Sequence, residues 1–342
     1  MLKLKKLRRF LRPFVYSNEI ILSEQFAFGH REVYQRFLNF NPKKILLAEL
    51  QHGWYLNPTW TPQGNNSQRQ LNKKLKLFPL LVWSRELAAN MNKDRGYSVY
   101  PISSPWSLIT RNYEIRKRNK LAPDYKEKKG SVLYFPAHSI PGMQYDLNFE
   151  AIKKIGDLQK FKFVTTSLYW TDFLDPMVRE RFGSYSNVTC MGLRSPSSID
   201  APWHDIGGRV NFLYQLHKSI SEHEFIVTDE IGTAAMASVV LGKKVYITQK
   251  KVYYNLIHRS EKQPMLCIDN EDILNRYGIV EYTDGLGYKI SENPEILELA
   301  RSGFGYDISL EETGKTVERY LGDSNFSLPG FHFDDYSSTT LW

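Results

Sequence analysis

The sequence predicts an α/β fold divided into two domains, with strands arranged in doubly wound parallel sheets. The chain has 342 residues, about twice the length of a typical single domain. Apolar runs of strand length alternate with helical segments, a pattern typical of parallel sheets covered by helices. A charged, turn-rich stretch over residues 116–131 separates the two halves, and interdomain linkers have this composition.

The N-terminal half is predicted to contain three short strands, each an apolar run bounded by turn residues or polar segments. Ser84 has the chemistry of an N-cap and is expected to start a helix over residues 85–91. Residues 54–70 contain several Pro, Gly and Asn residues and are predicted to form a loop. The predicted strands are Lys44–Leu50, Phe78–Trp83 and Tyr97–Ile102.

The C-terminal half shows the strand–helix alternation more clearly. Helices are expected near residues 146–157, 207–221 and 233–241, and the pattern becomes helical again after about residue 295. This order predicts a parallel, doubly wound sheet. The predicted strands are Val132–Phe135, Phe161–Leu168, Val188–Gly192, Phe225–Thr228 and Lys244–Thr248.

These elements divide the chain into five parts. A basic amphipathic segment at the N-terminus precedes an α/β domain, which a linker joins to a larger α/β domain, and a helix with a polar, aromatic tail follows. The corresponding ranges are 1–18, 19–120, 121–131, 132–305 and 306–342.

Composition excludes several classes of protein. Hydrophobic residues make up 42% of the chain and charged residues 24%, which is ordinary for a globular protein and excludes a mostly disordered one. Two cysteines, Cys190 and Cys267, are too few for a disulfide scaffold or a CxxC zinc module and fit a reduced, cytoplasmic setting. The sequence has no run of 18 apolar residues that would span a membrane.

Several catalytic signatures are also missing from the sequence. It has no GxxxxGK[ST] phosphate loop, no HExxH metal motif and no GxSxG nucleophile elbow. Its eight histidines do not form a metal-spaced cluster, so we expect no metal site and no resident cofactor.

The net charge of +8 is concentrated at the N-terminus. Residues 1–18 carry six Lys or Arg and no acid, which leaves the rest of the chain near +2 and argues against nucleic-acid binding. Leu4, Leu7, Leu11 and Phe14 recur at helical spacing in this segment. Residues 1–15 are therefore predicted to dock on an anionic membrane surface. The alternative is a basic terminus that frays or packs on its own domain.

The most informative candidate site follows the strand Phe225–Thr228. Asp229 and Glu230 end the strand, and Gly232 and Thr233 open a helix of small residues. Ligands of open parallel sheets bind at such strand ends, and helix N-terminal amides favour phosphate. We therefore predict a phosphate or diphosphate site, with the two carboxylates directed at ribose or sugar hydroxyls. The alternative is an ordinary strand–helix crossover in which these side chains cap the helix.

Two further constellations also follow strand ends. Glu49 and His52 lie beside Gly53, and both are of the general-base type that can accept a proton from an acceptor hydroxyl. His138 and Ser139 follow the strand Val132–Phe135 and are candidates for binding a donor phosphate. The structural alternatives are a strand-end histidine with a carboxylate partner for the first and turn chemistry for the second.

Three segments together resemble bacterial enzymes encoded with capsule and O-antigen genes, which are two-domain glycosyltransferase-like proteins of the GT-B type. They are LLAELQHGW, PLLVWSRELA with GYSVYPISSPW, and VLYFPAHSIPG with VTDEIGTAAMASVVLGKKVYI. The resemblance spans roughly residues 44–250. It implies two Rossmann-like domains with a cleft between them, of which residues 19–120 would form the acceptor side and residues 132–305 would bind the nucleotide donor. Related polymer transferases often have Ser-Ser or Ser-Thr where this chain has Ile231-Gly232-Thr233.

The resemblance also implies roles for the candidate residues. His52 or Glu49 would be the acceptor-side base, and His138, Ser139, Glu230, Gly232 and Thr233 would face the donor. The implied reaction moves a sugar from a nucleotide-sugar co-substrate to a lipid-linked or growing polysaccharide acceptor of capsule, O-antigen or lipopolysaccharide, without a metal ion. The enzyme would act on the cytoplasmic face of the inner membrane. The alternatives are a CDP-polyol phosphotransferase of teichoic-acid-like polymer synthesis and a non-catalytic polysaccharide-assembly protein.

Overall fold

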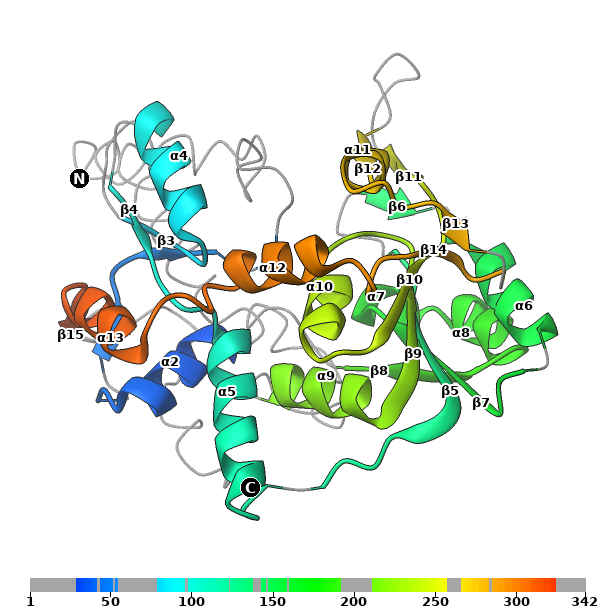
Figure 1. Cartoon of the computed structure of the whole chain (residues 1–342), viewed down its shortest axis with the longest axis horizontal. Coiled ribbons are helices and arrows are strands. Elements are labelled where there is room, and N and C mark those ends of the chain that lie inside the picture. The colour runs from blue at the N-terminus through cyan, green and yellow to red at the C-terminus, as the bar shows by residue number, and fades with distance from the viewer. Residues whose placement is uncertain are drawn as a thin grey trace, which may run out of the picture.

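The computed structural model confirms an α/β fold with parallel sheets in both halves of the chain (Figure 1). It describes residues 29–41, 44–51, 53–54, 79–95, 98–122, 124–137, 143–145, 147–158, 160–191, 211–256, 266–282 and 285–323. Residues 1–15, which are predicted to dock on a membrane, lie outside the described residues.

The N-terminal half is built on a three-stranded parallel sheet. Its strands are β2 (Glu49–Leu50), β3 (Leu80–Val82) and β4 (Val99–Pro101), with Leu50 beside Leu81 and Leu81 beside Tyr100. The helices of this half are α2 (His30–Leu38), α4 (Arg85–Arg95) and α5 (Pro105–Arg118). The Ser84 hydroxyl accepts a hydrogen bond from the Leu87 amide at 3.3 Å, which confirms its predicted role as an N-cap.

The prediction of one continuous strand over Lys44–Leu50 is wrong, because this stretch divides into two strands. The segment β1 (Lys44–Leu46) pairs antiparallel with β15 (Leu321–Asp323), whereas β2 pairs in parallel with β3. The Leu47 amide donates to the carbonyl of Tyr320 at 2.8 Å. The break has a long-range cause, since the partner of β1 comes from near the other end of the chain.

The seven-stranded sheet of the C-terminal half is doubly wound. From β5 (Lys128–Phe135) the chain adds β7 (Phe163–Leu168) and β8 (Asn187–Cys190) on one side. It then adds β9 (His223–Thr228) and β10 (Lys244–Ile247) on the other side, and all of these pairings are parallel. The strand order therefore reverses between β5 and β9, and ligands of such sheets bind at the carboxyl ends of the strands at this switch point.

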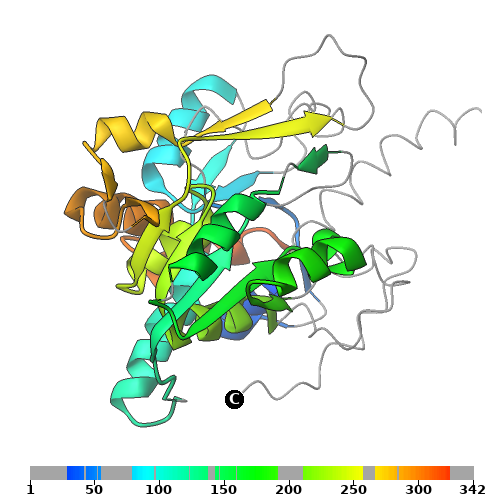
Figure 2. The same ribbon diagram turned by 90° about the vertical axis from the view of Figure 1, so that its right-hand side faces the viewer.

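Helices cover both faces of this sheet (Figures 1 and 2). Alternate residues of β5 point to opposite faces, so Leu133 packs with one hydrophobic cluster while Val132 and Tyr134 pack with another. The first face carries α9 (Asn211–Glu222), α10 (Thr233–Val240) and α12 (Pro294–Gly303). The second carries α6 (Phe149–Asp157) and α8 (Pro176–Gly183), with the short α7 (Trp170–Leu174) just before α8.

Among the described residues, six strands and five helices lie outside the predicted elements. The strands β6 (Met143–Tyr145), β11 (Lys251–Leu256) and β12 (Leu266–Asp269) form an antiparallel sheet, with α11 (Glu271–Arg276) after it. The hairpin of β13 (Glu281–Tyr282) and β14 (Gly287–Lys289) adds an antiparallel edge to the large sheet. The sixth strand is β15. These strands are short and partly polar, so they lack the apolar run on which a sequence-based prediction depends.

The polypeptide crosses between the two halves at two places. The first crossing lies between α5 and β5, and β5 begins at Lys128, within the stretch 121–131 that the sequence predicts as a linker. At the other end, α13 (Leu310–Glu318) returns to the N-terminal half, where Arg85 pairs with Asp307 and Glu312 at 3.0 and 2.7 Å. The segment that follows α12 therefore packs on the first half of the chain.

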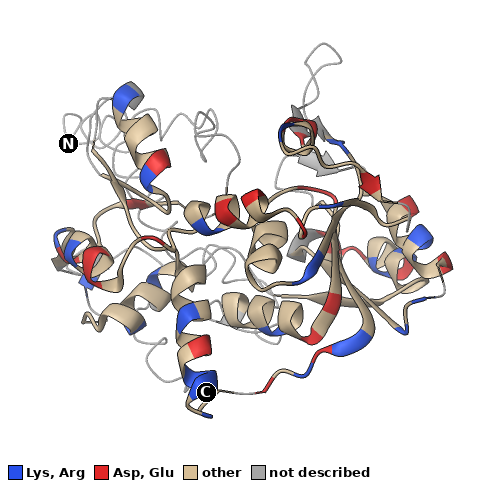
Figure 3. Ribbon diagram, viewed as in Figure 1, with Lys and Arg blue, Asp and Glu red and all other residues tan. Residues whose placement is uncertain are grey.

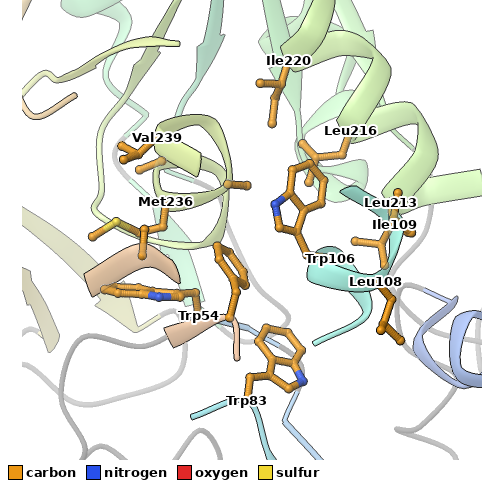
Figure 4. Packing of buried hydrophobic residues seen from close by; sticks show 14 of the residues in the cluster. Trp54, Trp83, Trp106, Leu108, Ile109, Leu213, Leu216, Ile220, Met236 and Val239 are labelled. Carbon is orange, nitrogen blue, oxygen red and sulfur yellow. The ribbon is translucent and has the colours of Figure 1, made fainter. Parts of the chain in front are cut away.

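A single hydrophobic cluster runs through the junction of the two halves (Figure 4). It contains residues of α5 and of the N-terminal strand ends together with residues of α9 and α10, so the two halves share buried surface. The residues labelled in Figure 4 are Trp54, Trp83, Trp106, Leu108, Ile109, Leu213, Leu216, Ile220, Met236 and Val239.

One titratable side chain, His217 of α9, is buried in this junction. Its ring lies 5.7 Å from that of Trp106, 4.5 Å from that of Tyr113 and 5.9 Å from that of Tyr125. In the described part of the chain its Nε2 has no hydrogen-bond partner. Burial, with smaller contributions from the nearby Lys117 and Lys243, lowers the pKa of His217 to about 4.

We expect His217 to make the stability of the junction depend on pH. In the unfolded chain its pKa is near 6.5 and in the fold it is about 4, so unfolded protein binds the proton more tightly between these values. The contribution of neutral His217 to the free energy of unfolding is therefore complete above pH 6.5. It is lost as the pH falls towards 4, and the total loss is about 3 kcal/mol. Urea unfolding at several pH values measures this loss.

The variant His217→Phe serves as the control, because it keeps a ring in the aromatic contacts and cannot titrate. Its free energy of unfolding should change less across the same pH window than that of the parent chain. An identical pH dependence in the two proteins would show that His217 is not its source.

Candidate functional site

The site predicted after β9 lies at the switch point of the doubly wound sheet. Thr228 ends β9, and the backbone of residues 229–232 turns into α10, whose N-cap is Gly232. Among the described residues no side chain caps this helix, and its first turn is closed by the Met236 amide on the Gly232 carbonyl. The amides of residues 233–235 therefore have no acceptor within the helix, and Gly232 and Thr233 are partly exposed. Such a helix end binds anions.

Asp229 is the best-connected side chain of this corner. Its carboxylate is fully buried and accepts hydrogen bonds from Tyr134 Oη, the Ala137 amide, Asn148 Nδ2 and Thr248 Oγ1 at 2.8, 3.0, 3.1 and 2.5 Å. Burial raises the pKa of the Asp229 carboxyl, and these hydrogen bonds oppose the rise. The carboxylate thus joins the loops that follow β5, β9 and β10 to the start of α6.

Asn270 holds the same corner from the other side. Its Oδ1 accepts from the Ile231 amide at 2.9 Å, and its Nδ2 donates to the carbonyls of Asp229 and Gln249, both at 2.8 Å. The side chain is completely buried. Both strands that border the corner are therefore tied to the start of α11, and the backbone before α10 is fixed in place.

Sequence reasoning missed four residues of this network, namely Tyr134, Asn148, Thr248 and Asn270. Thr248 ends a predicted strand beside the predicted site, so the meeting of strand ends at one sheet edge is a signal that could have found it. Asn270 follows β12, a strand that was not predicted, and nothing in the sequence alone brings it to the site.

Glu230 and Gly232 lie against each other at the entrance to α10. A Cβ atom built on Gly232 would lie 3.4 Å from Glu230 Oε1. The carboxylate of Glu230 therefore stands beside the helix N-terminus, where the helix dipole favours negative charge. Gly232 has φ −130° and ψ −157°, an extended conformation that any residue adopts, so a larger residue there is excluded only by what occupies the space beside it.

Thr233 connects the corner to the N-terminal half. Its Oγ1 accepts a hydrogen bond from the backbone amide of Trp54 at 2.9 Å, across 179 residues of sequence. The Trp54 indole in turn packs on Gly303 at the end of α12, where an added Cβ would lie 2.0 Å from its Nε1. The structure thus brings together the segment around residue 52 and the start of α10, which the sequence analysis singled out separately.

The other predicted residues are placed as follows. Glu49 lies in β2 with 1% of its surface exposed, and Gln51 is equally buried, accepting from the Trp83 amide at 2.8 Å and donating to the Gly53 carbonyl at 2.6 Å. His52, His138 and Ser139 lie outside the described residues. Ala137, whose amide is bound by Asp229, directly precedes His138 in the chain.

The described residues offer neither a metal cluster nor a membrane-spanning helix. They contain no group of three or more His, Cys, Asp or Glu side chains able to hold a metal ion. None of their helices combines the length and the hydrophobicity needed to cross a bilayer.

No family model matches the chain, and no curated protein matches it significantly. Among solved structures, the wall teichoic acid polymerase TagF is 11% identical, with a TM-score of 0.39 over 80% of this chain and 67% of that one. UDP-GlcNAc 2-epimerase from Neisseria meningitidis bound to UDP-GlcNAc is 13% identical, with a TM-score of 0.35 over 80% and 69%. The pneumococcal O-GlcNAc transferase GtfA in complex with UDP and GlcNAc is 12% identical, with a TM-score of 0.37 over 85% and 54%. The structural similarity is distant in each case.

The contact between Trp54 and Gly303 can be tested with a matched pair of variants. Gly303→Ala should destabilise the fold by roughly 1–3 kcal/mol, because the new methyl group has to displace a buried indole. Gly183→Ala is the control, because Gly183 also ends a helix but a Cβ there would meet nothing within 4 Å. Urea unfolding followed by circular dichroism measures both. Equal effects of the two substitutions would contradict the packing of Trp54 on α12.

Proposed function

We propose that the chain is a metal-independent glycosyltransferase that moves a sugar from a nucleotide-sugar donor to a lipid-linked or growing cell-surface polysaccharide. One observation carries the proposal. The uncapped N-terminus of α10 lies at the switch point of a doubly wound sheet and is bonded through Thr233 to a segment of the other half of the chain. A donor phosphate bound there would lie beside an acceptor held by the N-terminal half.

The chemistry at α10 suits departure of a nucleotide. When the bond between sugar and phosphate breaks, negative charge develops on the leaving phosphate, and oriented amides stabilise it without a metal ion. The Thr233 oxygen accepts from Trp54, so the proton of the hydroxyl is available to donate to a phosphate oxygen. Gly232 presents no side chain at the helix end, and the Glu230 carboxylate, which lies 3.4 Å from the position of an added Cβ there, could accept hydrogen bonds from ribose or sugar hydroxyls.

Asp229 has a different role in this proposal from the one expected of it. Its carboxylate is buried and already accepts hydrogen bonds from four residues. It would therefore hold the donor-binding corner in place without contacting the nucleotide sugar. His138 and Ser139 would complete the donor side, as they follow Ala137 at the same edge of the sheet. Residues 1–15 would hold the enzyme on the cytoplasmic face of the inner membrane, where lipid-linked acceptors lie.

For the acceptor side we propose His52 as the general base. A base has to come within hydrogen-bond distance of the acceptor hydroxyl, and Glu49 is 1% exposed within the sheet. That burial favours His52 over Glu49, and Glu49 then contributes to the packing beneath the segment that carries His52.

The donor assignment predicts that Thr233→Val weakens binding of the cognate nucleotide by about tenfold, because a hydrogen bond to a charged group is lost. The nucleotide is first identified as the member of a UDP, GDP, CMP and CDP panel that raises the melting temperature, and its affinity is then measured by calorimetry. Gly232→Val should weaken binding as well, by filling the space beside the helix end.

Thr313→Val is a matched control for this experiment. The Thr313 hydroxyl accepts a long-range hydrogen bond from the Ser103 amide at 3.0 Å, just as Thr233 accepts from Trp54, but it lies on α13. Its loss should lower stability and leave nucleotide affinity unchanged. Equal affinities in Thr233→Val, Gly232→Val and the parent chain would overturn the donor site.

The base assignment predicts that His52→Ala lowers turnover by about 10²–10⁴-fold with little change in nucleotide affinity. The assay supplies nucleotide sugars, CDP-polyols and a lipid-linked acceptor, and it follows the product by mass spectrometry. Glu49→Gln should retain most of the activity. Transfer of a polyol phosphate in this assay would instead identify a phosphotransferase, and nucleotide binding without turnover a non-catalytic assembly protein. Normal turnover of His52→Ala would shift the role to Glu49.

A further inference from the structure

The C-terminal end of α5 exposes two large aliphatic side chains. Ile115 is 58% exposed, and Leu121, just beyond the helix, is 64% exposed. The helix is buried along most of its length, from Pro105 to Thr110 and again at Tyr113, so the exposed residues begin where the helix leaves the core. Figures 1 and 2 show this end of α5 projecting past the body of the protein in both views.

The turn after α5 holds these side chains in a fixed geometry. The Leu121 amide donates to the Arg116 carbonyl at 2.7 Å, and the Lys120 amide donates to the Lys117 carbonyl at 3.0 Å. This is the Schellman arrangement, in which the residue after the turn usually packs back on the helix. Leu121 stays exposed in spite of that geometry, and Arg116 Nη2 also bonds its carbonyl at 3.0 Å.

Cations surround the two aliphatic residues. Lys117, Arg118 and Lys120 are exposed, and within the described ranges none of them forms an ion pair. Lys120 has φ +57°, a left-handed conformation in which glycine is usual and a side chain is costly. Figure 3 shows this basic end of α5 and the further basic start of β5, where Lys128 and Lys129 lie.

The acidic residues nearby do not neutralise this surface. Glu127 is paired with Lys243 at 2.6 Å, and over residues 114–129 seven Lys or Arg face three Asp or Glu. We call Ile115, Lys117, Arg118, Lys120 and Leu121 the α5 tip. It combines a small aliphatic centre with a ring of cations.

We propose that the α5 tip docks on an anionic lipid bilayer, with Ile115 and Leu121 entering the headgroup–acyl boundary and the cations contacting lipid phosphates. Aliphatic side chains gain by leaving water for the acyl boundary, and each cation near an anionic surface adds attraction. A nucleic acid would use the cations but would leave both aliphatic residues in water. This contact is separate from residues 1–15 and does not depend on the proposed transferase activity.

Depth-sensitive fluorescence on the full chain tests the contact directly. In a Cys190→Ser, Cys267→Ser background, Leu121→Cys is labelled with an environment-sensitive dye and mixed with phosphatidylcholine vesicles with and without phosphatidylglycerol. We expect a blue shift and increased emission with the anionic vesicles alone. Met177→Cys, at an exposed position on α8 with 79% exposure, is the labelled control and should not respond. An unchanged spectrum at position 121 would overturn the proposal even if the protein binds vesicles elsewhere.

Sedimentation with the same anionic vesicles measures how much the tip contributes. Arg118→Gln with Lys120→Gly should lower the partition coefficient about tenfold or more, since two cations are lost. Glycine is favoured at the φ of residue 120, so this variant cannot lose binding through strain in the turn. The control, Lys153→Gln with Met177→Ser, removes an exposed cation and an exposed apolar side chain far from the tip and should bind like the parent. Equal partitioning of all three proteins would contradict the role of the tip.

Discussion

The fold of the C-terminal half depends on one buried carboxylate. Parallel strands end at a common edge of the sheet, and each is followed there by a loop whose buried polar groups need hydrogen-bond partners. Asp229 links three strand ends at once, because its carboxylate accepts from the Ala137 amide after β5 and from the Thr248 hydroxyl after β10, and Asp229 itself follows β9. A buried charge is costly unless every oxygen is hydrogen-bonded, and Tyr134 and Asn148 complete the set. The corner that is proposed to bind the donor is thereby built from a constraint of the sheet itself.

The two halves are coupled at the point where this corner meets the N-terminal strand ends. Thr233 accepts from Trp54, Trp54 packs on Gly303, and α12 carries the chain back towards Arg85 and β1. The buried cluster in Figure 4 lies beneath these contacts. A shift of α12 would therefore also move Trp54 and the N-terminus of α10. These are the elements proposed to bring acceptor and donor together.

The sequence predicted those parts of the fold that local pattern and chain order determine. Apolar runs located the five parallel strands of the large sheet, and Ser84 located the start of α4 because a cap is a local interaction. The partner of β1 lies some 275 residues away in β15, and no local signal divides Lys44–Leu50 into two strands. At the site, the sequence located the turn before α10 but assigned Asp229 to the ligand, because Tyr134, Asn148 and Thr248 become its partners only when three strand ends meet.

In helix α5, packing explains the residues up to Tyr113 but does not explain the exposed residues that follow. Trp106, Ile109 and Tyr113 recur at helical spacing and are buried against the rest of the junction, so packing accounts for their identity. Past Tyr113 the helix has no core to cover, and stability alone would be served by polar residues and by glycine at the turn. The chain instead has Ile115 and Leu121 exposed and a lysine in a left-handed conformation. The left-handed lysine costs the folded protein free energy, and the two aliphatic side chains stay more than half exposed, so the proposed contact with a bilayer of anionic lipid gives both features a physical reason.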